Sequence, residues 1–220
     1  MLKLFRSELQ KCKHLDELGV NRDADGRTAI TGRNQDHVWD FLPLKQARSA
    51  SQFTNFPHLT IVLNRDYAAA TIVVPNGMKG GFLRKLKHDE NGFERFKDLI
   101  LKIENRLRQT VEKTKAKPII CLLQRHYYPN RHSPNYDVTL EADLRTLVEC
   151  SASKSKVKYQ PGWLKMIYAV LVHKQSNIQL AVEVQFPYDC KEIRSCKATE
   201  LYAEAWDAMS PLLDFVLDRN

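Results

Sequence analysis

The sequence has no long uninterrupted run of apolar residues. Its longest apolar runs, such as residues 119–123, are far shorter than the roughly 20 residues that a membrane-spanning helix needs. The first 18 residues carry charges throughout, and they lack the apolar stretch and small-residue cleavage site of a signal peptide. These absences predict a soluble, cytoplasmic protein without a membrane partner.

Cysteines are few and do not form an obvious set of pairs. The five are an odd number and are widely scattered, which argues against a disulfide framework: Cys12, Cys121, Cys150, Cys190 and Cys196. Only Cys190 and Cys196 lie close together, and without a second pair or a nearby histidine they are a poor zinc signature. No local pattern couples Cys121 or Cys150 to a histidine as a catalytic dyad.

Motifs that identify a reaction are also absent. Residues 76–88 contain three glycines and several basic residues after a predicted strand, but they lack the spacing and the Lys-Ser/Thr ending of a Walker loop. Glycines let a backbone approach a phosphate closely, so we predict phosphate contacts here by Lys79, Arg84, Lys85 and Lys87. The alternative is a simple turn. The sequence has no internal repeat and gives no sign of oligomeric state.

Positive charge is in excess. The net charge is +8 and the sequence pI is about 9.2. Residues 57–116 hold 12 Lys and Arg against 7 Asp and Glu, whereas residues 161–220 hold 6 against 8. A basic middle beside an acidic C-terminal part favours one positive face that attracts nucleic acid or another polyanion. A solvated, mildly basic surface is the alternative.

Hydrophobic periodicity predicts an α+β fold in one domain, residues 1–220, with an N-terminal lead-in (1–56) and an α+β core (57–220). Helical spacing predicts an amphipathic helix at 2–18, and 32–56 is expected to be mostly loop with a turn of helix near 37–42. A β-hairpin follows at 59–63 and 71–74. A long helix at about 92–115 has an apolar stripe and an Asn91/Glu94 capping box.

About four mostly antiparallel strands should follow the long helix, at 119–123, 137–145, 163–173 and 178–186. The run at 166–172 fits a strand or a buried helix, and we favour the strand because a polar turn would join it to 178–186 as a hairpin. A C-terminal helix from residue 198 should pack on the sheet, with Ser210-Pro211 kinking it or starting a second helix.

The loop between the first two of these strands has the densest set of ligand-capable side chains. Arg125, His126, Arg131 and His132 lie there among tyrosines, and they are predicted to contact phosphate or stack on bases. His126 is also the candidate general base. A loop held together by aromatic packing is the alternative explanation.

Carboxylates on strands form the candidate catalytic set. Alternation places Glu141, Asp143 and Arg145 on one face of the strand at 137–145. It places Glu183 and Gln185 together on one face of the strand at 178–186. If the strands are neighbours, Glu141 or Asp143 could converge with Glu183 on Mg²⁺ or Mn²⁺, with Asp143 and Glu183 as the metal ligands. Many metal-dependent nucleases have an Asp followed by Glu-x-Lys, and Gln185 replaces that lysine here. A solvated sheet face is the alternative.

We therefore expect a nucleic-acid-associated protein that binds phosphates through its basic face. A more specific form of this hypothesis is a metal-dependent nuclease. An enzyme for a small phosphorylated or acidic substrate is one alternative. A noncatalytic protein-interaction module is another.

Overall fold

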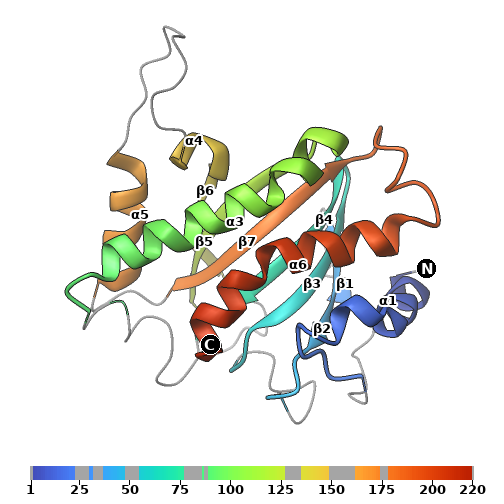
Figure 1. The fold of residues 1–220 in the computed structure, drawn as a ribbon, viewed down its shortest axis with the longest axis horizontal. Coiled ribbons are helices and arrows are strands. Elements are labelled where there is room, and N and C mark those ends of the chain that lie inside the picture. Colours follow the sequence, from blue (N-terminus) through green and yellow to red (C-terminus); the bar gives the residue numbers. More distant parts are fainter. Residues whose placement is uncertain are drawn as a thin grey trace, which may run out of the picture.

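The computed structural model describes residues 2–22, 30–31, 37–47, 55–76, 86, 89–126, 135–148, 162–173 and 178–219. They form the predicted α+β fold (Figure 1). The helices are α1 (Leu2–Lys11), the short 3₁₀ helix η1 (Lys13–Leu15), α3 (Gly92–Thr114), α4 (Leu144–Val148), α5 (Gly162–Val172) and α6 (Ala198–Leu217). The strands are β1 (Ile30–Thr31), β2 (His37–Pro43), β3 (His58–Asn64), β4 (Tyr67–Val74), β5 (Lys117–His126), β6 (Asn135–Asp143) and β7 (Ile178–Pro187).

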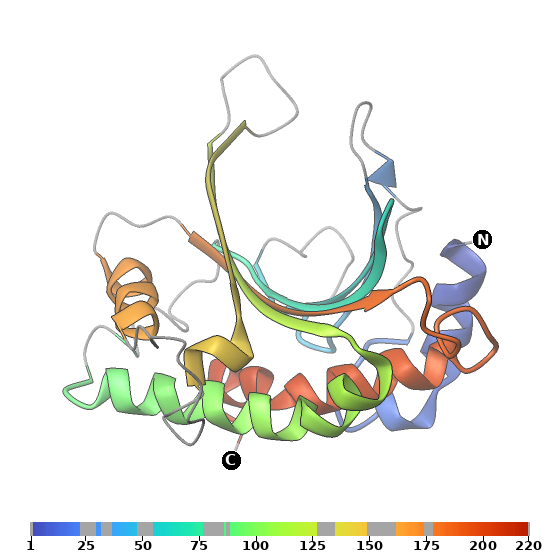
Figure 2. The ribbon, with the colours of Figure 1, turned by 90° about the horizontal axis from the view of Figure 1, so that it is seen from above.

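The strands build one curved antiparallel sheet in the order β1-β2-β3-β4-β7-β5-β6. Strand β7 is inserted between β4 and β5, which are adjacent strands in the sequence. The long helices α3 and α6 run along the outside of the curve (Figure 2). We call the side that they cover the convex face and the opposite side the concave face.

The core lies between the convex face and the two long helices. Alternation along β7 sends Val182, Val184 and Phe186 to this side, where all three are fully buried. The α3 stripe packs there through residues that include Phe96 and Ile103. Burial of this apolar surface is the main stabilising contribution of the fold.

Several local predictions are confirmed. The hairpin of β3 and β4 turns at Asn64, whose side-chain oxygen accepts hydrogen bonds from the backbone N–H groups of Asp66 and Tyr67 at 2.8 and 2.7 Å. The long helix ends at Thr114, and Lys115 follows it with a left-handed φ of 57°. The predicted capping box is wrong, because the side chain of Asn91 makes no capping hydrogen bond.

The expectation of mostly loop for residues 32–56, with a helical turn near 37–42, is wrong at residues 37–43. That segment is β2, which pairs with β3 along its whole length. Trp39 and Phe41 point to the concave face and Val38 and Leu42 to the convex face, so both sides of the strand carry apolar residues. The alternation that indicates a half-exposed strand was therefore missing.

The predicted strand at 163–173 is also wrong, because the segment is helix α5. Leu164, Ile167 and Leu171 have helical spacing and are buried, and the Tyr168 hydroxyl donates to the backbone oxygen of Leu86 at 2.9 Å. The apolar run did not distinguish the two structures, and packing against the core decided between them. Within the described ranges, no helix combines the length and the apolar character needed to cross a bilayer.

Two boundaries also differ from the predictions. Strand β6 ends at Asp143, so Arg145 belongs to α4 and does not share a strand face with Glu141. Because residues 162–172 form α5, the described residues after α3 contain three strands where about four were expected. Helix α6 continues through Pro211, so Ser210-Pro211 does not begin a second helix.

Candidate functional site

The concave face has a polar centre, and strand register places its members in rows. One row crosses six neighbouring strands and consists of Phe41, Thr60, Thr71, Glu183, Ile119 and Asp143. Because directly paired residues point to the same side of a sheet, these side chains all face away from α3 and α6. Glu183 lies in the middle of this row.

Glu183 is half-buried, and two neutral donors hold its carboxyl group. The Thr71 hydroxyl donates to Oε2 at 2.8 Å, and the Gln185 side-chain nitrogen donates to Oε1 at 2.9 Å. Among the described residues, no Lys, Arg or His forms an ion pair with it. Burial raises the pKa of Glu183, and the nearby Glu141 raises it further, while the two hydrogen bonds oppose the shift.

Two other ionisable side chains share this environment. Burial, with contributions from Glu141 and Glu183, raises the pKa of the Cys121 thiol to about 12. Burial, together with the same two carboxyls, raises the pKa of Tyr67 to about 12. Both groups are therefore neutral at physiological pH, and this centre favours uncharged or cationic neighbours.

Thr60 stands beside Thr71 in the row, and its hydroxyl has no hydrogen-bond partner among the described residues although Thr60 is only 6% exposed. Buried hydroxyl groups in native proteins nearly always have a partner. Beyond Thr60, on β2, the rings of Trp39 and Phe41 lie 6.2 Å apart between centroids. The polar centre thus has an aromatic side on β2 and a carboxyl side on β6.

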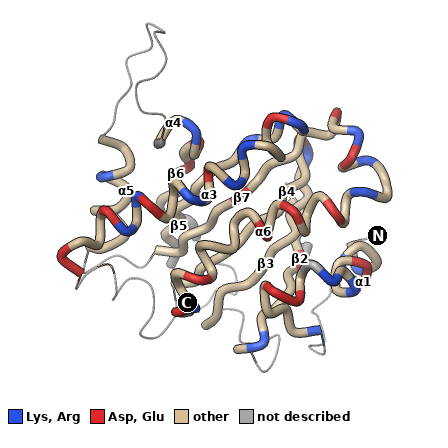
Figure 3. Tube along the Cα trace, viewed as in Figure 1, with Lys and Arg blue, Asp and Glu red and all other residues tan. Residues whose placement is uncertain are grey.

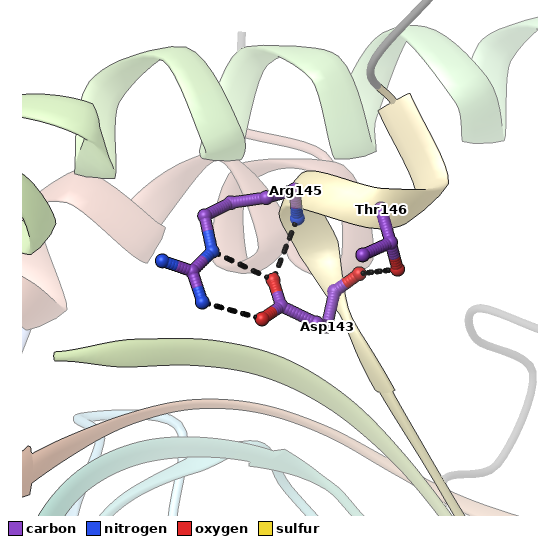
Figure 4. A network of polar contacts seen from close by, with 3 residues as sticks. All are labelled: Asp143, Arg145 and Thr146. Carbon is purple, nitrogen blue, oxygen red and sulfur yellow. Dashed lines mark hydrogen bonds and ion pairs between the residues drawn. The ribbon is translucent and has the colours of Figure 1, made fainter. Parts of the chain in front are cut away.

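The structure places the predicted metal ligands in different surroundings. Asp143 accepts two hydrogen bonds from the Arg145 guanidinium, at 2.9 and 2.6 Å, and one from the Arg145 backbone N–H at 2.9 Å (Figure 4). Asp143 therefore caps the start of α4, where Thr146 also donates to its backbone oxygen at 2.8 Å. Ile119 separates Asp143 from Glu183 in the row.

No group of three or more His, Cys, Asp and Glu side chains within the described part of the chain is arranged to hold a metal ion. Glu141 is exposed on β6, opposite Cys121, and it acts electrostatically on Glu183. Binding of Mg²⁺ or Mn²⁺ through Asp143 and Glu183 stays a prediction.

Most of the predicted phosphate-binding residues lie outside the described residues: Lys79, Arg84, Lys85, Lys87, Arg131 and His132. Arg125 and His126 are the last two residues of β5, and the structure describes their backbone. The strand ends are nevertheless informative. Val74, near the end of β4, pairs with Leu180 of β7, and Gln124 of β5 pairs with Ile178 at the start of β7. The chain therefore leaves β4 and β5 at the same end of the sheet, with only β7 between them.

The net charge of the chain is divided unevenly. Segments outside the described residues contain 12 Lys and Arg and 4 Asp and Glu, a balance of +8 that equals the net charge of the whole chain. The described residues therefore hold 22 of each sign and have no net charge. Figure 3 shows basic and acidic residues side by side along α3.

All three arginines of α3 have acidic partners, and the two in its second half illustrate this. Arg106 pairs with Asp207 of α6 at 3.0 Å and also donates to Ser210, which fastens the two long helices together. Arg108 pairs with Glu104 at 3.0 Å within α3. A helix surface that is already compensated in this way is a weak attractant for a polyanion.

Sequence reasoning found Glu183 and Gln185 but missed Thr60, Thr71, Tyr67 and Cys121 as their neighbours. Thr71 was assigned to a strand, at 71–74, without a prediction of which face it occupies. Its contact with Glu183 depends on β7 being inserted beside β4, which no local pattern indicates. Comparisons of the chain with protein-family models, curated proteins and solved structures found no match.

Proposed function

We propose that the protein binds nucleic acid or a similar polyanion at the end of the sheet where β4 and β5 finish. We call this the basic end. The segments that connect to it, residues 77–85, 87–88, 127–134 and 174–177, contain six Lys and Arg and no Asp or Glu. They are Lys79, Arg84, Lys85, Lys87, Arg131 and Lys174.

The observation that carries the proposal is the concentration of charge on a neutral framework. Three connections leave or enter neighbouring strands β4, β7 and β5 at one end of the sheet, and they hold six Lys and Arg against two acidic residues, Asp89 and Glu90 just before α3. Clustered positive charge that exceeds the nearby carboxylates creates the local potential that attracts phosphates. The same +8 spread evenly over the surface would create a weaker field at any one place.

Binding of a fluorescently labelled oligonucleotide, measured by anisotropy at increasing salt concentrations, tests the proposal. Affinity should fall steeply with salt, because each phosphate contact contributes about 0.7 to 0.9 to the slope of log K against log salt. Replacing Lys79, Arg84, Lys85 and Lys87 together by alanine should reduce the slope by about three if all four contact phosphate. No binding by the wild-type protein at low salt would remove the proposal.

A matched control removes four basic residues at the opposite end of the sheet. Lys113 and Lys115 near the end of α3, and Lys191 and Arg194 after β7, are exposed and give the same change in net charge when replaced by alanine. This variant should keep most of the salt dependence. Equal losses in the two variants would mean that net charge alone, and not the basic end, determines binding.

Metal-dependent cleavage of the bound nucleic acid is a more specific form of this function. If Glu183 holds Mg²⁺ or Mn²⁺, Glu183→Gln should abolish cleavage and leave oligonucleotide binding intact or tighter, because the substitution removes the charge and keeps the size. Wild-type protein that binds but cleaves neither single- nor double-stranded substrate with either metal would leave binding as the function.

A small phosphorylated or acidic substrate would use the same positive charge. Competition separates this alternative from a polyanion. Inorganic phosphate or a mononucleotide should displace the oligonucleotide only at concentrations where general salt does so, since one phosphate makes few of the contacts. Displacement at much lower concentrations would favour the small substrate. Binding to neither class would leave a noncatalytic interaction module.

A further inference from the structure

The polar centre of the concave face contains a carboxyl group that has no oppositely charged partner among the described residues. Glu183 is half-buried, and its described partners, Thr71 and Gln185, are neutral. A carboxylate taken from water is costly unless a cation or a full set of hydrogen bonds compensates it. Each oxygen of Glu183 accepts one of these bonds and keeps a second lone pair available. The centre can therefore accept further donors.

Thr60 provides an independent observation at the same place. Its hydroxyl is buried, lies on the concave face and makes no hydrogen bond within the described part of the chain. Its neighbour in the row is Thr71, the donor to Glu183. Leaving a buried hydroxyl unsatisfied is unfavourable, whereas valine has nearly the same shape and no such cost. An unsatisfied threonine beside an uncompensated carboxyl is expected where a bound molecule supplies the missing partners.

The surroundings indicate the chemical class of that molecule. The neighbouring positions of the same face hold the small residues Ala69 and Ala181, which add neither a charge nor a side-chain hydrogen-bonding group next to Glu183. Aromatic rings of β2 lie on one side, and Glu141 on β6 adds a second negative charge on the other. Aromatic faces and carboxylates together favour organic cations. A phosphate or carboxylate ligand would be repelled by the two glutamates.

We propose that the concave face binds a small organic cation, with its ammonium or guanidinium group at Glu183 and an oxygen or nitrogen of the molecule at the Thr60 hydroxyl. Access is from the side of Tyr67, Cys121 and Glu141, which are partly or fully exposed. The site is independent of the proposed polyanion binding, because it uses the opposite charge preference and the centre of a sheet face.

Thermal denaturation with defined probes tests this site. Butylammonium, phenethylammonium, ethanolammonium and guanidinium should each be compared with n-butanol, which has similar apolar surface and no charge. At least one cation should raise Tm in a saturable manner, because a ligand that binds only the folded state stabilises it. No saturable increase with any of these cations would overturn the proposal. A saturable increase with Mg²⁺ or Mn²⁺ alone would overturn it in favour of a metal site.

Two substitutions then locate the site by calorimetric titration of the best probe. Glu183→Gln should weaken binding at least roughly tenfold, because it removes the charge that pairs with the cation. Thr60→Val should weaken binding of the probe that has a hydroxyl roughly fivefold, as expected for one lost hydrogen bond. The same substitution should leave butylammonium binding unchanged.

A control with the same chemistry is Glu200→Gln, on the exposed surface of α6. It should bind every probe as the wild type does. Equal weakening by Glu200→Gln and Glu183→Gln would show that only the net charge matters and would overturn the assignment to the concave face. Unchanged affinity in Glu183→Gln would overturn it as well.

Discussion

The two faces of the sheet are built from the same strands, yet they differ in what their buried residues do. On the convex face, Val182, Val184 and Phe186 are covered by helices, and their role is to fill the core. On the concave face, Thr60, Thr71 and Gln185 are at most 9% exposed, although all three are polar. Burial is thus shared by both faces, but these buried residues are apolar on the convex face and polar on the concave face, where they need hydrogen-bond partners.

This difference shows why an alternating strand does not by itself indicate a solvated side. In β7 the polar positions were expected to face water or a metal, and instead they form a hydrogen-bonded set with β4. A polar network inside a protein is stabilising only when its members are satisfied. Among the described residues of the concave face, Thr71 and Gln185 both donate to Glu183, whereas the Thr60 hydroxyl has no hydrogen-bond partner. That contrast supplies the sharpest tests.

The largest effect is expected on the convex face. Ile103 is fully buried in the α3 stripe, so Ile103→Ala should lower the free energy of unfolding by about 2 to 5 kcal/mol. Urea denaturation measures this loss, and Lys102→Ala, at an exposed position of α3, should change the value by less than about 0.5 kcal/mol. A similarly small loss for Ile103→Ala would contradict the packing of α3 described above.

A smaller effect is expected for Thr71→Val, which removes the hydroxyl that donates to Glu183. Hydrogen bonds to charged groups contribute about 1.5 to 3 kcal/mol, so this change should destabilise the fold within that range. Thr60→Val is the matched control, because it removes a neighbouring buried hydroxyl for which the described residues provide no partner. It should change stability by less than about 0.5 kcal/mol or increase it. Equal losses would mean that the two threonines do not differ as the structure indicates.

The pH dependence of stability should identify Glu183. Burial raises its pKa in the folded protein above the ordinary value of 4.5, so as pH rises the unfolded chain releases this proton first. The stability that protonated Glu183 contributes is then fully present below pH 4.5, and it is lost as the pH rises from 4.5 to the raised pKa of the folded state. The free energy of unfolding of Glu183→Gln, minus that of wild type, should therefore increase with pH across this window. A constant difference in urea titrations from pH 4 to 8 would contradict the raised pKa.

The last prediction concerns the rate of thiol labelling and involves no change in the free energy of unfolding. The pKa of Cys121 is raised to about 12, mainly by burial, so little thiolate is present near pH 8. Iodoacetamide should modify Cys121 roughly two to three orders of magnitude more slowly than an ordinary thiol. Peptide mass spectrometry can follow Cys121 beside the exposed Cys196 in one sample. Comparable rates at the two cysteines would show that the concave face is more open than described.

Local patterns correctly predicted the helices and strands in which apolar residues recur with one clear period. The stripe of α3 and the alternation of β3 and β7 were sufficient, because one face of each had to be apolar. Strand β2 and helix α5 were predicted wrongly for a shared reason. Both are apolar on more than one side, so neither a two-residue nor a 3.6-residue period stood out.

The residues of the candidate site were predictable one at a time, but their association was not. Glu183, Glu141 and Asp143 were identified as carboxylates on strands, and the sheet places only the first two in electrostatic contact. Asp143 instead caps α4 through Arg145, because β6 ends at Asp143 and a short helix begins there. Because β6 ends two residues earlier than predicted, Asp143 has a capping role in the structure, and its role as a metal ligand stays a prediction.

The sequence by itself determined the α+β class, the long amphipathic helix, the β3–β4 hairpin and the concentration of basic residues in a few connecting segments, because each depends on composition or on local periodicity. Only the tertiary structure decided that β7 enters the sheet between β4 and β5. That insertion aligns Thr60, Thr71 and Glu183 in one row and brings the ends of β4 and β5 to the same end of the sheet. The physical reason is that strand order depends on how the whole apolar surface is buried under α3 and α6, and no single segment contains that information.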